Sequence, residues 1–239
     1  MNKFKSAVLY EFSIKIKAIG IFYLIQYMVV AFIFALIALF TDENEVGSNA
    51  LEVSTIIFLS IVGVLGYKED FKALIQNGYT RKYIYLSTVC MFILMSATMA
   101  LIDTVIGNTL HHFRVGYFTL YGGLYGYGNL LGNWIYLAVL YFMCCNLAYF
   151  AVLVINKVGK LVSLFMGVGL GGLVLIVIAL FRFVLSSQVV HSVGEFMMKA
   201  MGFVGQGSVD ILNPVLFFLV IGAMFGICSY AVIRRTELK

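Results

Sequence analysis

Long apolar runs dominate this chain, and polar residues gather in the short stretches between them. A helix needs about 20 residues to cross a hydrocarbon layer of about 30 Å, and six segments have approximately that length. These segments are 19–40, 50–67, 84–107, 130–155, 161–184 and 213–233. Such runs favour helices over the short alternating strands of a membrane β-barrel. The pattern predicts an all-α, polytopic membrane protein with six transmembrane helices in a single transmembrane domain, residues 1–239.

Two further patterns predict helices that lie along the membrane surface. In residues 1–18, apolar side chains recur every fourth position, which is typical of an interfacial helix. They are Phe4, Val8, Phe12 and Ile16. In residues 186–212, between the fifth and sixth spans, apolar side chains again follow helical spacing. They are Val193, Phe196, Met197, Ala200, Met201 and Val204. We expect an N-terminal interfacial helix and an extracytoplasmic helix in the outer leaflet.

Composition supports a membrane location and excludes several classes of function. Of the 239 residues, 62% are hydrophobic and 11% are charged, which excludes an ordinary soluble domain. The net charge of +5 does not indicate nucleic acid, because the basic residues flank apolar segments, where they contact phospholipid headgroups. His111 and His112 are adjacent and would point about 100° apart on a helix. We therefore predict neither a metal site nor a set of catalytic residues.

The distribution of Lys and Arg predicts the orientation of the chain. Most of the 16 basic residues precede the first span, lie between spans two and three or four and five, or follow the sixth. The remaining loops lie on the opposite side, and the first of them, between spans one and two, carries Asp42, Glu43 and Glu45 instead of basic residues. Basic residues are enriched in cytoplasmic loops. We expect a multi-pass protein of the bacterial cytoplasmic membrane with both termini in the cytoplasm.

The cytosolic segment 68–80, between spans two and three, has the features of a small folded element. Phe71, Leu74 and Ile75 fall on one face of a short helix, and Asn77-Gly78 supplies a left-handed stop. Thr80 then caps the third span, whose first turn carries Arg81 and Lys82 at headgroup level. The sequence predicts a helix that presents its apolar face to a cytosolic protein partner.

This layout resembles the type-2 permease subunits of bacterial ATP-binding-cassette exporters, including those that export phenol-soluble modulins and antimicrobial peptides. The resemblance rests on the order of the elements and on "GYTRKYIY", which is similar to the Gly-x-Ser/Thr-Arg pattern of these permeases. It implies that residues 69–78 form a coupling helix that docks on a separate ATPase subunit. The residues implied in ATPase coupling are Glu69, Phe71, Leu74, Ile75, Gly78, Thr80 and Arg81.

The resemblance also implies the partners and the cargo. Two permease copies would work with two ATPase subunits, and ATP and Mg would bind the ATPase, because this chain has no phosphate-loop motif. The chain alone would not be an enzyme. The expected cargo is a hydrophobic or amphipathic substrate, in the first place a membrane-active peptide, while lipid-linked glycans and hydrophobic drugs stay open. Phe196, Met197 and Met201 would form an exit surface or simply cover the bundle.

Two charged residues lie well inside the predicted spans. Asp103 and Arg182 follow the start of parallel spans by similar distances, so we expect an ion pair that either gates the outer mouth or neutralises two buried charges.

An alternative function is a secondary transporter or channel that needs no ATPase, although no midplane carboxylate is evident for a proton or sodium site. An intramembrane protease would need a constellation of His, acidic and hydroxyl groups, which Asp103 alone does not supply.

Overall fold

The computed structural model describes residues 3–40, 51–113, 117–204 and 209–234, and this part of the chain is helical without any β-strand. The helices are α1 (Lys3–Phe40), α2 (Glu52–Leu65), the π-helix η1 (Gly66–Phe71), α3 (Lys72–Gln76), α4 (Arg81–Phe113), α5 (Leu120–Tyr125), α6 (Leu130–Val158), α7 (Lys160–Phe183), α8 (Ser187–Ala200) and α9 (Leu212–Arg234).

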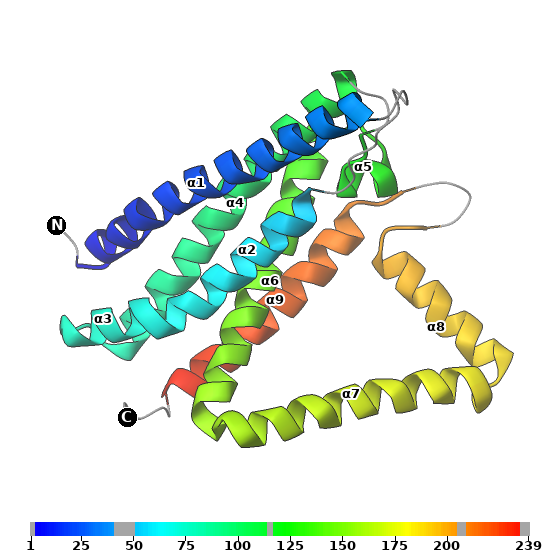
Figure 1. Cartoon of the computed structure of the whole chain (residues 1–239). Helices are drawn as coiled ribbons and strands as arrows, with labels where there is room; N and C mark the ends of the chain where they lie inside the picture. The colour runs from blue at the N-terminus through cyan, green and yellow to red at the C-terminus, as the bar shows by residue number, and fades with distance from the viewer. Residues whose placement is uncertain (1–2, 41–50, 114–116, 205–208, 235–239) are drawn as a thin grey trace.

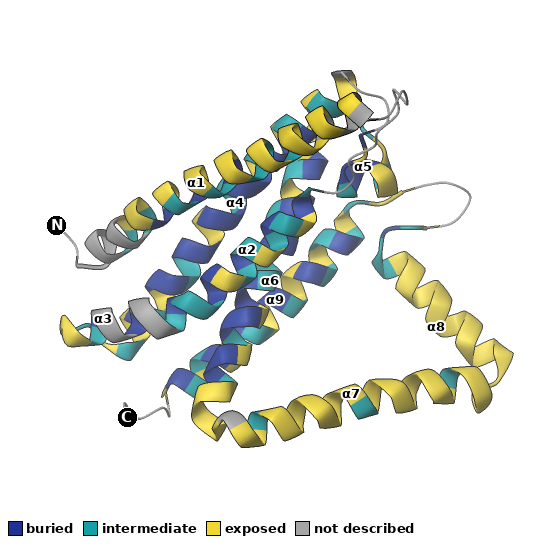
Figure 2. Ribbon diagram, in the orientation of Figure 1, coloured by how far each residue is buried: buried dark blue, intermediate teal, exposed yellow. Residues whose placement is uncertain are grey.

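Helix α6 forms the centre of the bundle. It packs against α2, α4 and α9, and α1 lies across α4 (Figure 1). The buried residues gather where these helices meet (Figure 2), and the core includes fully buried Tyr141 and Tyr149 of α6 and Phe92 of α4. The outward faces remain apolar, as expected when lipid rather than water is the solvent.

Five helices are long and apolar enough to cross a membrane, namely α1, α4, α6, α7 and α9. This confirms the predicted all-α membrane architecture in its general form. The predicted second span is α2, which has 14 residues and is shorter than the other five. At 1.5 Å per residue such a helix covers only about 21 Å, and the π-helix η1 then continues the chain.

The N-terminal segment differs from the prediction. Residues 1–18 were expected to form a separate interfacial helix, but α1 runs without interruption from Lys3 to Phe40. Neither proline nor glycine-serine pairs, which commonly kink helices, occur near residue 18. Of the predicted apolar face, Val8 and Phe12 are partly buried, but Ile16 is exposed and Lys15 is buried instead. The spacing also could not show that the same helix continues into the span.

Helices α7 and α8 stand apart from the bundle. In Figure 1, α7 leaves the lower end of α6 and α8 turns back at an angle toward α9. The apolar window of α7 has no buried residue, and α8 has none either (Figure 2). The predicted helix between spans five and six therefore exists as α8, within the predicted segment 186–212.

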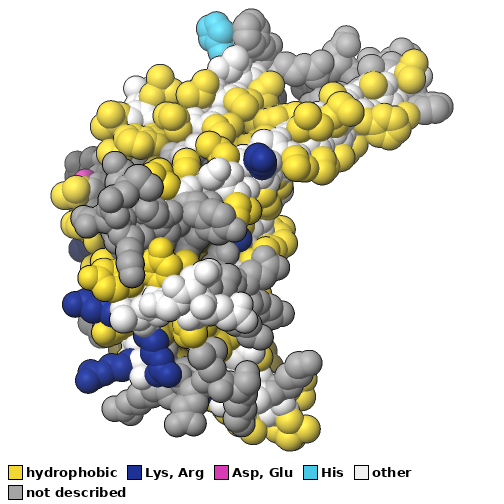
Figure 3. All heavy atoms as spheres, turned by 90° about the vertical axis from the view of Figure 1, so that its left-hand side faces the viewer, with side chains coloured by type: hydrophobic (Ala, Val, Ile, Leu, Met, Phe, Trp, Pro, Cys, Tyr) yellow, Lys and Arg dark blue, Asp and Glu magenta, His cyan; other side chains and the backbone are white. Residues whose placement is uncertain are grey.

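The N-terminal end of α1, the α2–α4 connection, the end of α6 and the C-terminal end of α9 share one end of the bundle (Figure 1). The Arg81 guanidinium donates to the Arg234 carbonyl at 3.1 Å, which joins the start of α4 to the end of α9. Lys and Arg side chains mark this face in Figure 3. We call it the connector end, and the opposite end, which carries α5, the α5 end.

Small residues bring the central helices close together. A Cβ on Gly63 would lie 2.6 Å from the Cys145 carbonyl oxygen, so α2 and α6 meet backbone to backbone. A Cβ on Gly222 would lie 3.3 Å from the Met143 Cα on α6. Glycine allows this approach because it has no side chain to displace.

Candidate functional site

The connector between α2 and α4, residues 66–80, is a candidate surface for a partner. Its predicted apolar face does not point outward, which corrects the sequence-based interpretation. Phe71 is 1% exposed and Leu74 6% exposed, and the Phe71 ring stacks on Tyr67 with centroids 5.2 Å apart. Ile75 is half-buried and packs against the same core. These side chains anchor the connector to the bundle rather than exposing an apolar face.

The exposed part of the connector is its tip. Gln76, Asn77, Gly78 and Thr80 are exposed, as is Lys82 at the start of α4. Glu69 lies in η1, and its side chain is outside the part of the structure that is described. Any partner at this site would therefore meet polar and basic groups together with backbone.

The predicted left-handed stop is confirmed at Gly78, whose φ is 77°. Its N–H donates to the Ile75 carbonyl at 2.9 Å, and the N–H of Tyr79 donates to the Leu74 carbonyl at 3.1 Å, which closes α3. Helix α4 then begins at Arg81, so Thr80 occupies the capping position, and its carbonyl accepts from the Ile84 N–H at 3.0 Å.

A second candidate site is a buried polar cluster near the α5 end. Asp103 of α4 is 5% exposed. Its Oδ1 accepts from the Tyr23 hydroxyl of α1 at 2.8 Å, and its Oδ2 accepts from the Tyr141 hydroxyl of α6 at 2.5 Å. The Tyr23 hydroxyl also lies 3.1 Å from the Met99 carbonyl. Two phenol donors thus satisfy this carboxylate across three helices.

The structure does not bring Asp103 and Arg182 together, so the predicted ion pair is corrected. Arg182 is exposed on α7, with its guanidinium carbon 5.6 Å from the centroid of the Phe183 ring. Helix α7 stands away from the bundle that holds Asp103, and similar distances along two helices do not place them in contact.

Glu52, near the start of the predicted span 50–67, belongs to the same region. It is 2% exposed, and its Oε1 accepts from the Leu120 N–H at 3.1 Å. A Cβ on Gly107, one turn beyond Asp103, would lie 3.9 Å from that oxygen. A sequence signal existed: Glu52 and Thr55 are three residues apart and so share one face of α2.

The predicted exit residues lie at the α8–α9 connection. Phe196 and Met197 are exposed on α8, whereas Met201 is partly buried and its carbonyl accepts from the Tyr125 hydroxyl of α5 at 2.8 Å. Burial raises the pKa of Tyr125, so this phenol remains a hydrogen-bond donor at neutral pH. The contact attaches the α8–α9 connection to the α5 end of the bundle.

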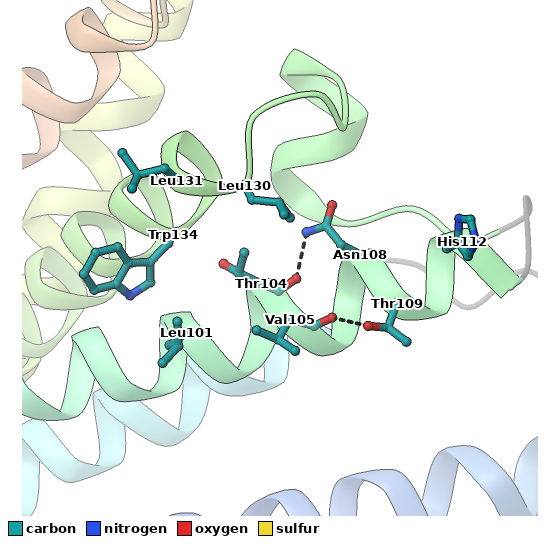
Figure 4. Close-up of a pocket in the computed structure, with 9 residues that line it drawn as sticks. All are labelled: Leu101, Thr104, Val105, Asn108, Thr109, His112, Leu130, Leu131 and Trp134. Atoms are coloured by element: carbon teal, nitrogen blue, oxygen red, sulfur yellow. Dashed lines mark hydrogen bonds between the residues drawn. The ribbon is translucent and has the colours of Figure 1, made fainter.

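Two grooves open on the surface of the bundle. One, of 570 Å³, lies between α4 and the start of α6, and its apolar walls include Leu101 and Trp134 (Figure 4). Asn108 and His112 add polar groups along the same wall, and the Asn108 amide donates to the Thr104 carbonyl at 2.7 Å. The other groove, of 780 Å³, lies between α2 and α6. Both would suit apolar chains.

Comparison with protein-family models, with curated proteins and with solved structures finds no match to this chain.

Proposed function

We propose that this chain is the membrane-spanning permease subunit of an ATP-driven exporter, with ATP hydrolysed by a separate subunit. The observation that carries the proposal is the connector, which has an exposed polar tip and a buried apolar base. Because Phe71 and Leu74 are packed in the core, a movement of an ATPase held at the tip would be passed directly to α2 and α4. A flexible loop would not transmit such a movement.

The same proposal defines the assembly. Two copies of this permease pair with each other and with two ATPase subunits, which hold ATP and Mg. The connector end faces the cytoplasm of a bacterial cell, because its Lys and Arg residues follow the charge bias of cytoplasmic loops. The exposed basic side chains Lys82 and Lys157 lie at this end.

For the cargo we propose a hydrophobic or amphipathic molecule, in the first place a membrane-active peptide. The groove between α4 and α6 supports this choice, because apolar walls and polar groups lie side by side in it. Exposed Phe196 and Met197 on α8 add an adaptable apolar surface beyond the bundle. The flexible thioether side chain of Met197 can adapt to cargo of variable shape.

The decisive experiment is co-purification of the tagged permease in nanodiscs with an ATPase subunit expressed from the same operon. Wild type should retain the ATPase. The double variant Gln76→Glu/Lys82→Glu, which reverses the charge of the exposed tip without touching its buried base, should retain at least about ten-fold less, a difference of about 1.4 kcal/mol.

Lys157→Glu is the control, since it makes the same Lys-to-Glu change as at position 82, at the connector end but outside the connector. It should bind the ATPase like wild type. If wild type retains no ATPase, the exporter proposal fails. If the tip variant retains it as well as wild type, the docking surface has been wrongly assigned to the connector.

A secondary transporter or channel is the second candidate function. It is favoured by one observation, the buried pair Glu52 and Asp103, because intramembrane carboxylates are typical of proton and sodium pathways. The two candidates differ in their energy source. Cargo transport into inverted vesicles that requires ATP and the ATPase subunit supports the exporter, while transport driven by an ion gradient alone supports the alternative.

A further inference from the structure

The region around Glu52 and Asp103 contains two buried carboxylates without a basic partner. Among the described residues, neither makes an ion pair with Lys or Arg, and both are at least 95% buried. Two charges of the same sign are costly in such a place unless something positive accompanies them.

Hydrogen bonding divides the two carboxylates into different roles. Asp103 accepts from a phenol hydroxyl at each of its oxygens, an arrangement that suits an ionised carboxylate. Glu52 uses Oε1 to accept from the Leu120 N–H, while its buried Oε2 has no hydrogen-bond partner among the described residues. Oε2 of Glu52, rather than either oxygen of Asp103, is therefore the carboxylate oxygen that lacks a donor.

A second unpartnered oxygen points to the same place. The Thr55 side chain is completely buried, and its Oγ1 has no hydrogen bond of acceptable geometry. It lies beside both Asp103 and the Tyr23 hydroxyl, three residues after Glu52 on the same face of α2. Buried hydroxyls normally find a partner, and the neighbours of this one are Asp103 and Tyr23, at the edge of the acidic cluster.

Among the described residues, the side chains that face the cluster from the neighbouring elements are mainly tyrosines. From α1, Tyr23 and Tyr27 face it; from α6, Tyr141 faces it. From the segment before α5, Tyr117 lies within electrostatic range of both carboxylates. The Tyr117 carbonyl is itself bonded to Nδ1 of His111 at 2.8 Å.

We propose that Glu52, Thr55 and Asp103 form a binding site for one monovalent cation, a proton or a sodium ion, at the α5 end of the bundle. A proton would sit on Oε2 of Glu52. A sodium ion would bind between that oxygen and the Thr55 hydroxyl, with Asp103 supplying the second negative charge. A divalent ion fits less well, since the described residues hold no group of three or more acidic, His or Cys side chains.

The site is placed to influence the α5 end. Glu52 holds the first N–H of α5 through Leu120, and α5 holds the α8–α9 connection through Tyr125. Binding or release of the cation would therefore change the contacts of α5, where the segment with the proposed exit residues attaches to the bundle. This inference is independent of whether an ATPase drives transport.

The test uses full-length protein in nanodiscs and two readouts. Infrared difference spectroscopy on changing pH detects the C=O stretch of a protonated carboxyl, and thermal unfolding is followed as N-methylglucamine chloride is replaced by sodium chloride at constant ionic strength. A proton site gives a protonated-carboxyl band in wild type that Glu52→Gln removes. A sodium site gives no such band but raises the unfolding temperature of wild type by at least about 2 °C, and Glu52→Gln abolishes the rise.

Glu195→Gln is the matched control, because that carboxylate is exposed on α8 beside His191, and it should leave both readouts unchanged. Thr55→Val keeps both carboxylates and serves if Glu52→Gln does not fold. It should shift the frequency of the proton band or at least halve the sodium effect. The proposal is overturned if wild type shows neither the protonated-carboxyl band nor the sodium effect. It is also overturned if either effect survives unchanged in Glu52→Gln, or in Thr55→Val where Glu52→Gln does not fold.

Discussion

Asp103 is held in the bundle by phenol hydroxyls from two neighbouring helices, and this makes each hydroxyl energetically important. Tyr141→Phe removes the donor to Oδ2 without changing the shape of the ring. A buried carboxylate oxygen left without its donor should cost about 1–3 kcal/mol of unfolding free energy. The measurement is SDS-induced unfolding in mixed micelles. Tyr230→Phe is the control, because Tyr230 contacts Tyr85 through its ring and no described residue bonds its hydroxyl. Equal losses of unfolding free energy in both variants would contradict the role assigned to Tyr141.

Individual residues also show where sequence reasoning stops. Asp103 was identified correctly as a buried charge, because its position inside an apolar run fixes its depth. Its partners could not be identified, since tyrosines are frequent in this chain and helix position does not show which helices touch. Glu52 was overlooked for a related reason: a carboxylate at the start of a span is normally solvated, and its burial comes from packing against the start of α5 and against α4.

At the scale of the element, the connector should depend on its buried base for stability. Phe71→Ala should cost about 3–5 kcal/mol, because it removes a fully buried ring from the core. Gln76→Ala, at the exposed tip, should change the unfolding free energy by no more than about 0.5 kcal/mol. SDS-induced unfolding compares the two. Equal, small effects would restore the original prediction that the Phe71 side of this helix faces outward.

The turn of the connector allows a second test at this scale. Gly78 has a φ of 77°, and an added Cβ would meet no atom within 4 Å, so any cost of Gly78→Ala comes from the backbone alone. We expect a loss of about 1–2 kcal/mol. Gly123→Ala is the control, because Gly123 also has open space around it but a negative φ within α5. A Gly78→Ala protein as stable as wild type would show that the turn does not need the left-handed conformation.

For the whole molecule, apolar length was sufficient to predict the class of fold and the approximate positions of the long apolar helices. It was not sufficient to predict how α1 continues through residue 18, or that α7 stands apart from the bundle. Both depend on tertiary packing, and in lipid an apolar face carries no information about whether a helix or an acyl chain will cover it. The buried side of the connector was missed for the same reason.

The arrangement of the helices predicts which parts of the chain face the same side of the membrane. The tip of the connector and the end of α6 share one end, whereas α5 and the turn after it lie at the other (Figure 1). In a background without the four native cysteines, single cysteines at Gln76 and Lys157 should resist a membrane-impermeant maleimide in intact cells and react after permeabilisation. A cysteine at Gly128, an exposed residue after α5, should react in intact cells. Reaction of Gln76 and Lys157 from opposite sides would contradict the bundle itself, while reaction of both from outside would reverse the orientation that the basic residues imply.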